Sequence, residues 1–394
     1  MLFRSLFTFD SDLENDFGLP NYRPTAIRQV TSGGDHGWHG RAGEMLWNWT
    51  PEREEIQPPI VEIGPGSPTG ICFGHGAAFP RRYRDALFAC DWSYGRMFAV
   101  HLTPHGVTHT ADVEPFLSAQ GLPICDVAVS PRDHALWFLT GGRGTRSGLY
   151  RVTATGPIDD FPEGATADVA PAVDAASAAA RATRARLERF HGVVDASAID
   201  AAWEALGHED RAIRAAARAA LEWQPTEGWR QRALAETDPR TALQACLCLA
   251  RATAGDATAQ GEILAALERL DVAALPVEEQ GWYLRVLAIS ASRHGRFPPD
   301  AARRVLATVE PLLPVGDRHV DGAIVGLCAT LQSPTFLPAA LDLLEAARTQ
   351  EEQVIVVKAL LGSASSAPWT PALRERFLSL VLDRVPRWKG GFTA

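Results

Sequence analysis

Long apolar runs are missing from this sequence. No stretch approaches the roughly 20 consecutive apolar residues that a membrane-spanning helix needs, which argues against a membrane span. Positive charge is also scarce, because 38 lysine and arginine residues stand against 47 aspartate and glutamate residues. The formal net charge of -9 argues against a nucleic-acid partner, whose phosphates would need a basic face.

Cysteine is uncommon as well, with six in 394 residues and no C-x-x-C pair. This spacing excludes a zinc ribbon and a covalent haem site. A chain of this length is expected to form two or more domains. Its hydrophobic fraction of 46% and charged fraction of 22% are ordinary for a globular protein.

The N-terminal run MLFRSLFTFD has neither a long apolar stretch nor a small-residue cleavage site, so it does not read as a signal peptide. It enters a strand-like pattern at once. We therefore expect the sequence to be a piece of a longer protein, truncated at both ends.

The chain divides into two halves with different periodicity. Residues 1–156 are rich in glycine, proline and aromatic residues, and their short alternating runs predict strands. Residues 157–195 are rich in alanine and proline and predict a linker that becomes helical toward Arg186. Residues 196–394 are rich in alanine, leucine, arginine and glutamate with a helical period.

The β half contains an internal repeat of about 50 residues, the size of one four-stranded propeller blade. Ala86–Trp92 and Met97–Leu102 form one predicted strand pair, and Ala135–Thr140 and Leu149–Thr153 form the next. The sequence therefore predicts the last two to three blades of a β-propeller. The ring is expected to be incomplete.

The α half predicts an α-solenoid of HEAT-like helix pairs, because its amphipathic segments are short and separated by turn residues. Asp210–Leu221 (DRAIRAAARAAL) is typical of the second helix of such a pair. Its small residues allow close helix approach, and we expect its arginines at the solvated edge.

Two arginines form the candidate cofactor site. Arg143 and Arg146 lie in the glycine-rich run GGRGTRSG, which joins two predicted strands. Planar guanidinium groups suit a ligand that carries carboxylates. The alternative is that both arginines bind carbonyl groups of their own loop.

Four carboxylates form the candidate metal site. Asp10, Asp12, Glu14 and Asp16 alternate along an extended segment, and closely spaced oxygen ligands suit Ca²⁺. A solvated acidic edge would give the same pattern.

Three histidines spaced by four, His101, His105 and His109, fall on a predicted hairpin. His101 and His109 are expected to be cross-strand neighbours with no nearby carboxylate, which makes a poor metal site. No catalytic constellation can be assembled from the sequence, so the catalytic residues remain unknown.

Several runs carry a resemblance to a known family. They are Tyr22–Thr25 (YRPT), Ser32–Trp38 (SGGDHGW), Gly64–Gly70 (GPGSPTG), Asp91–Trp92, Gly141–Val152 (GGRGTRSGLYRV), Thr349–Gln353 (TQEEQ), Trp369–Thr370 and Arg387–Gly391 (RWKGG). Together they resemble the large secreted haem-binding proteins of planctomycetes and verrucomicrobia. Those proteins combine a propeller similar to the soluble glucose and sorbosone dehydrogenases, HEAT-type repeats and a cytochrome c module.

The resemblance implies a quinoprotein dehydrogenase of the periplasm or the secreted fraction. It would oxidise a sugar or another alcohol with pyrroloquinoline quinone and Ca²⁺, and would pass electrons to a haem module. This chain has no C-x-x-C-H motif, so no haem site is expected in it, and the early blades that hold the general base are not among its residues. As it stands, the chain is therefore expected to be inactive.

The alternative is a non-catalytic propeller that binds a glycan or a protein, with the HEAT-like repeats as an interaction scaffold. In either case a protein partner is expected on the solenoid.

Overall fold

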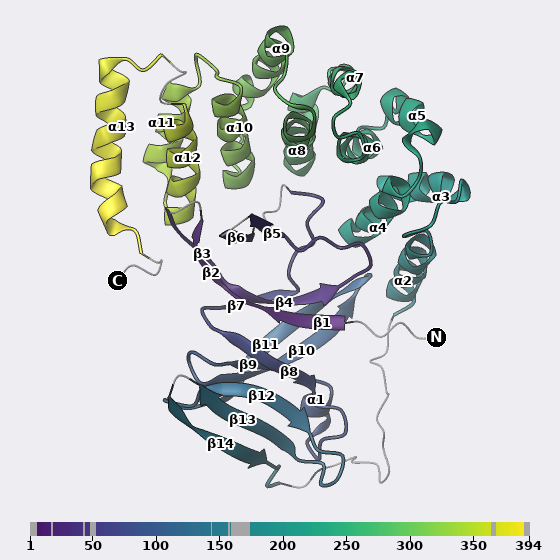
Figure 1. Ribbon diagram of the computed structural model, residues 1–394, viewed down its shortest axis with the longest axis vertical. Helices are drawn as coiled ribbons and strands as arrows, with labels where there is room; N and C mark the ends of the chain where they lie inside the picture. The colour runs from purple at the N-terminus through teal and green to yellow at the C-terminus, as the bar shows by residue number, and fades with distance from the viewer. Residues whose placement is uncertain are drawn as a thin grey trace. The chain divides into compact units, whose positions relative to one another are not determined.

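The computed structural model describes residues 6–16, 19–41, 44–47, 53–142, 144–156, 158, 174–363 and 368–389 (Figure 1). The chain forms two units. The first contains residues 1–13, 23–31 and 58–183, and the second contains residues 14–22, 32–57 and 184–394. The described helices include none that is both long enough and apolar enough to span a membrane.

The first unit consists of three antiparallel sheets. One sheet has the strand order β1-β4-β7, the next β11-β10-β9-β8 and the last β12-β13-β14. The strands are β1 (Leu6–Asp10), β4 (Thr25–Val30), β7 (Val61–Gly64), β8 (Pro68–Phe73), β9 (Leu87–Asp91), β10 (Arg96–His105), β11 (Thr108–Ser118), β12 (Ile124–Val129), β13 (Leu136–Gly142) and β14 (Thr145–Val152), with a short helix α1 (Arg81–Arg84) before β9.

Strand β9 of the middle sheet is buried on both faces. Successive side chains of a strand point to opposite faces, so β9 supplies two apolar surfaces. Leu87 packs in one cluster with Phe9 and Ile27 of the first sheet. Phe88 packs in a second cluster, whose members from the third sheet are Ile124, Val127, Leu136 and Phe138. The three sheets are therefore stacked face to face.

The far face of the third sheet is open. Leu139 and Leu149 are cross-strand partners on β13 and β14, and they are 47% and 62% exposed. The described part of the chain shows antiparallel sheets followed by helices, as predicted, but no closed ring of sheets.

The second unit is mainly helical. Its helices are α3 (Ser197–Leu206), α4 (Arg211–Glu222), α5 (Arg230–Ala235), α6 (Pro239–Ala252), α7 (Ala257–Leu267), α8 (Val277–His294), α9 (Pro299–Val309), α10 (Arg318–Thr330), α11 (Leu337–Ala346), α12 (Gln350–Gly362) and α13 (Pro371–Arg384), together with the 3₁₀ helices η1 (Thr226–Gly228), η2 (Val272–Ala274), η3 (Glu310–Leu312) and η4 (Val385–Arg387). Helix α2 (Ala175–Glu188) begins in the first unit and ends in the second.

Helices α4, α6, α8, α10 and α12 form an inner row, in which each packs on the next (Figure 1). Several of the helices begin where the sequence places an N-capping residue. Asp210, for example, accepts a hydrogen bond from the backbone of Ala212, and Thr349 forms a capping box with Glu352. The caps keep these helices short and regularly spaced.

Two early segments of the chain belong to the helical unit. They contain the hairpins β2 (Leu13–Asp16) with β3 (Leu19–Arg23) and β5 (Trp38–Arg41) with β6 (Glu44–Trp47). Strands β4 and β7 are neighbours in one sheet, so the chain leaves that sheet for residues 32–57 and then returns to it.

The main division between the units, after Thr183, falls within the predicted linker of residues 157–195, and the grouping differs from the prediction at the start of the chain. Strands do end at Val152, but α2 fills part of the predicted linker, and residues 14–22 and 32–57 group with the helices. The physical reason is a set of charged contacts between residues 53–57 and the inner helices, described below.

Candidate functional site

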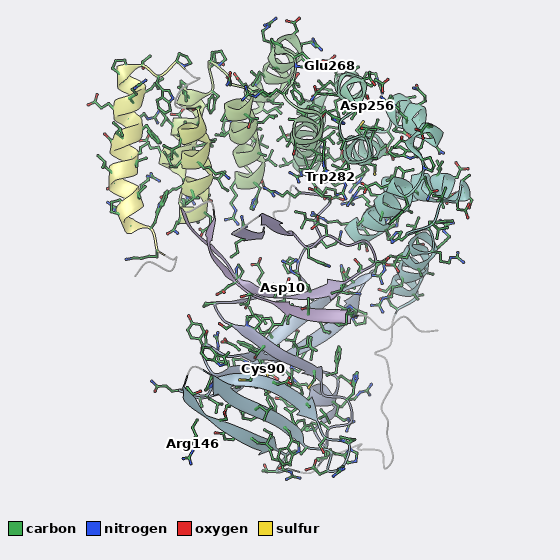
Figure 2. The ribbon with its side chains drawn as sticks, in the orientation of Figure 1. Asp10, Cys90, Arg146, Asp256, Glu268 and Trp282 are labelled. Atoms are coloured by element: carbon green, nitrogen blue, oxygen red, sulfur yellow. The ribbon has the colours of Figure 1, made fainter. Side chains whose placement is uncertain are left out.

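The structure extends the strands on both sides of the predicted arginine loop. Because β13 reaches Gly142 and β14 begins at Thr145, only two residues join them. Arg146 is an exposed residue of β14 at the outer end of this hairpin (Figure 2). Arg143 lies outside the described residues. The cofactor role of both arginines remains a prediction.

The predicted calcium ligands have separate surroundings. The Asp10 carboxylate lies 2.5 Å from Nε of the buried Arg28. Asp12 accepts a hydrogen bond from the backbone of Gly66 at 3.2 Å, and burial raises the pKa of its carboxyl. Glu14 and Asp16 lie on β2, whose residues from Glu14 on belong to the helical unit. Among the described residues, no three His, Cys, Asp or Glu side chains could hold a metal ion together. The calcium site remains a prediction.

The histidine hairpin differs from its prediction in two respects. His109 pairs across the strands with Pro104, not with His101. His101 does have a carboxylate partner, because its Nε2 lies 2.9 Å from Oε1 of Glu114. The hydrogen bond with His101 lowers the pKa of the Glu114 carboxyl. The prediction that His101 has no nearby carboxylate was wrong because it considered only residues close in sequence, whereas Glu114 is on the paired strand β11.

The glycine-rich runs that carry the family resemblance hold turns and sheets together. The backbone N–H of Ser67 donates to the buried Asp91 at 2.8 Å. The indole of Trp92 donates to the carbonyl of Gly141 at 2.7 Å, which joins the second sheet to the third. A side chain at Gly70 would come within 2.6 Å of the Cα of Asp126. These described contacts explain the glycines without a bound phosphate.

Arginines of α4 form a buried charged site among the described residues of the helical unit. Arg211, Arg214 and Arg218 are spaced by three and four residues, so they share one face of the helix. We expected them at the solvated edge, and this is wrong for Arg214 and Arg218, which are 1% and 3% exposed. Burying a guanidinium requires a compensating charge. That charge comes from the segment Arg53–Gln57, named here the acidic segment.

Glu54 is the centre of the site. Arg214 Nε donates to Glu54 Oε1 at 2.7 Å, and Arg218 Nη1 donates to the same oxygen at 3.0 Å. Nε of Arg211 lies 3.5 Å from Oε2. Burial alone would raise the pKa of Glu54, but the charges of Arg218 and Arg211 and the hydrogen bond from Arg214 outweigh it and lower the pKa. The carboxyl is therefore ionised in the folded chain.

The arginines also bind the main chain of the acidic segment. Arg211 Nη2 donates to the carbonyl oxygens of Arg53 at 2.5 Å and Ile56 at 2.9 Å. Arg218 Nη2 donates to the carbonyl of Glu54 at 2.8 Å. The segment itself forms a turn, because the backbone N–H of Ile56 donates to the carbonyl of Arg53 at 3.0 Å. Three carbonyls of this turn are thus held by two arginine side chains, independently of the turn's own side chains.

Glu55 extends the site to α8. Arg285 Nε donates to Glu55 Oε1 at 2.8 Å. Burial would raise the pKa of Glu55, but the charge and hydrogen bond of Arg285 lower it to about 2. The buried Trp282 lies on the same helix (Figure 2). The centroid of its ring is 4.5 Å from Cζ of Arg214. This cation–π contact joins α8 to α4.

Helix α6 completes the site. Its Gln244 accepts a hydrogen bond from Arg218, and both side chains are buried. The site is therefore built by three consecutive inner helices around one acidic turn. We name Arg211, Arg214, Arg218 and Arg285 the arginine cluster.

Neither the burial of these arginines nor the role of the acidic segment was predicted from the sequence. A usable signal existed in the i, i+3, i+7 spacing of arginines on an alanine-rich helix, which predicts a buried cationic stripe. Nothing in the local sequence identifies Glu54 as its partner, because the two lie about 160 positions apart.

Comparison with known proteins does not assign this chain to a family. No protein-family model matches the sequence, and no curated protein matches it. Among solved structures, the chain resembles a provisionally named oxidoreductase (glucose dehydrogenase) from Thermus thermophilus, at 18% identity and a TM-score of 0.27. The match covers 37% of this chain and 41% of that chain, so it spans about two fifths of the other protein. The matched protein is named as an oxidoreductase, the class that the sequence resemblance implies. A match with this TM-score assigns neither a fold nor a reaction to the present chain.

Proposed function

We propose that the helical unit is a HEAT-type interaction scaffold whose inner face binds acidic segments that form a tight turn, and that the acidic segment of this chain occupies it in cis. The observation that carries this proposal is the buried Glu54 carboxylate, which is contacted by three arginines of one helix. The sheets of the first unit are, in this proposal, blades of an incomplete β-propeller.

The geometry supports recognition more than stability. A buried ion pair contributes little net stability, because desolvating the charges offsets their attraction. Its use is to favour one binding register over the others. Here two successive carboxylates are matched by separate arginines on α4 and α8, and three backbone carbonyls are matched as well. The arrangement selects a tight turn with two adjacent acidic residues at its centre.

A trans-binding experiment tests the scaffold. The full chain carrying E54Q and E55Q keeps the shape of the acidic segment but removes its charge. We expect a synthetic peptide of residues 53–60 to bind this variant with a dissociation constant on the order of micromolar, since each hydrogen bond to a charged group contributes about 1.5–3 kcal/mol. The wild-type chain, whose site is already occupied, should bind it at least about tenfold more weakly.

The matched control is the same peptide with glutamine at both glutamate positions. Equal binding of the two peptides would show that charge is not recognised. A folded E54Q/E55Q chain, checked by circular dichroism, that binds neither peptide would contradict the proposal.

For the longer protein that the resemblance implies, we also propose quinone-dependent oxidation of a sugar or alcohol, with a quinone carboxylate near Arg146 and Ca²⁺ as the metal. The observation in its favour is that Arg146 is exposed on β14. Secretion to the periplasm or beyond, and transfer of electrons to a haem module, belong to the same proposal.

A further inference from the structure

A pocket at the far end of the helical unit is separate from the arginine cluster. It has a volume of about 300 Å³ and lies between the start of α12 and the end of α13. Its lining consists of Gln350, Gln353, Asp383, Arg384, Arg387 and Trp388. An indole and several planar polar side chains thus share one small concavity.

The charged groups of this pocket already have partners. Arg384 donates to the carbonyl of Ala347 at 3.0 Å and to that of Glu345 at 2.7 Å, so it caps the C-terminal end of α11. Arg387 forms an ion pair with Asp383, one helical turn away. Because these charges are compensated within the fold, the pocket is poorly suited to a free anion.

The neutral groups are held in fixed positions. The amide of Gln350 pairs in both directions with the backbone of Lys389, donating to its carbonyl and accepting from its N–H at 2.7 Å each. The indole N–H of the neighbouring Trp388 donates to Oε1 of Gln353 at 2.8 Å. That bond orients the amide of Gln353 and leaves its N–H₂ group as a donor beside the indole. The Gln350 pairing fixes the main chain that carries Trp388.

We infer that this pocket binds a neutral pyranose sugar. The C–H face of such a ring packs on an indole, and its hydroxyl groups bind planar amide, carboxylate and guanidinium edges. Hydroxyls both donate and accept, so they can use the second acceptor positions of Asp383 and the amide donor of Gln353 without needing a net charge. The volume suits one sugar ring. The inference is independent of the acidic-segment site.

The test is a titration of the full chain with D-glucose and D-galactose, followed by saturation-transfer NMR. We expect dissociation constants in the low millimolar range. Trp388→Ala should weaken binding about tenfold or more, because it removes the stacking surface. Trp388→Phe, which keeps a ring but loses the N–H that orients Gln353, should retain part of the affinity. The matched control is Trp369→Phe, since Trp369 packs on Phe377 and does not line the pocket.

Three outcomes would overturn the inference. The first is no saturation transfer from either sugar at about 50 mM, well above the expected constants. The second is binding that Trp388→Ala leaves unchanged. The third is binding of acetate or inorganic phosphate that competes with the sugar and is abolished by Arg387→Ala, which would make the pocket an anion site.

Discussion

The two units bury their inner surfaces by different means. The sheets of the first unit meet through apolar side chains such as Phe88 and Ile124, whose attraction has no fixed direction. The inner helices of the second unit meet the acidic segment through directed contacts between Glu54 and arginines. Apolar contacts tolerate small displacements of the packed side chains, whereas the hydrogen bonds between Glu54 and the arginines do not. The first unit is therefore stabilised by buried apolar side chains. In the second unit, directed contacts of the inner helices position the acidic segment.

The largest expected effect is on the apolar side of this comparison. Phe88→Ala should destabilise the sheet unit by about 3–5 kcal/mol, because it leaves a cavity between the second and third sheets. Chemical denaturation of the full chain measures it. Leu149→Ala is the control, since Leu149 is exposed and its truncation should cost less than about 0.5 kcal/mol. Equal effects of the two changes would show that the sheets do not share this core.

On the charged side, Glu54→Gln should destabilise the helical unit by about 3 kcal/mol, because three arginines then lose their counter-charge in a buried site. Thermal unfolding followed by circular dichroism at 222 nm, where helices dominate, measures it. Glu62→Gln, an exposed change on β7, is the control. If both variants melt with the wild type, the charge of Glu54 does not contribute to holding the segment.

Acid should sharpen the difference between the units through Glu55. Its pKa is about 2 in the folded chain and near 4.5 unfolded, so its stabilisation is complete above pH 4.5 and is lost as the pH falls toward 2. Between pH 5 and pH 3 this amounts to about 2 kcal/mol. We expect the E55Q chain to lose that much less stability over the same range. Parallel pH profiles of the two chains would contradict the assignment.

The smallest expected effect concerns Arg146. Because Arg146 is exposed, Arg146→Ala should change the unfolding free energy by less than about 0.5 kcal/mol. If a quinone carboxylate lies beside it in the longer protein, titration of that protein with pyrroloquinoline quinone should show about tenfold weaker binding for the variant. Arg146→Lys should recover part of the loss, since it restores charge without the planar fork. Unchanged affinity would assign Arg146 to the surface.

The periodic part of the fold could be predicted from the sequence. The run Ala86–Trp92 indicated β9, and Ile213–Leu221 falls within α4, because side-chain alternation and helical spacing are local properties. The bounds of the β13–β14 hairpin were missed, since the glycines of GGRGTRSG suggested a loop where a bulge between Thr140 and Gly142 continues the ladder.

The candidate site could not be predicted in the same way. Arg218 and Glu54 meet across 164 positions, and no local pattern encodes which distant carboxylate enters a cationic stripe. The partner carboxylate is determined by the course of the folded backbone. Residues 32–57, which connect the neighbouring strands β4 and β7, belong to the helical unit. The predicted arginine and calcium residues were found from local composition alone, and that information does not specify a partner.

The excursion of residues 32–57 has a consequence for dissecting the chain. A single cut between Val152 and Ala175 would place the helices and the acidic segment on different polypeptides. The contacts between them would remain. The products should remain associated as a split protein, whose halves reassemble only when the acidic segment is present. Residues 174–394 expressed alone would expose the arginine cluster to solvent, and would act as a receptor for the missing piece. No single cut in the sequence therefore divides this chain into its two units, because each unit consists of several separate segments.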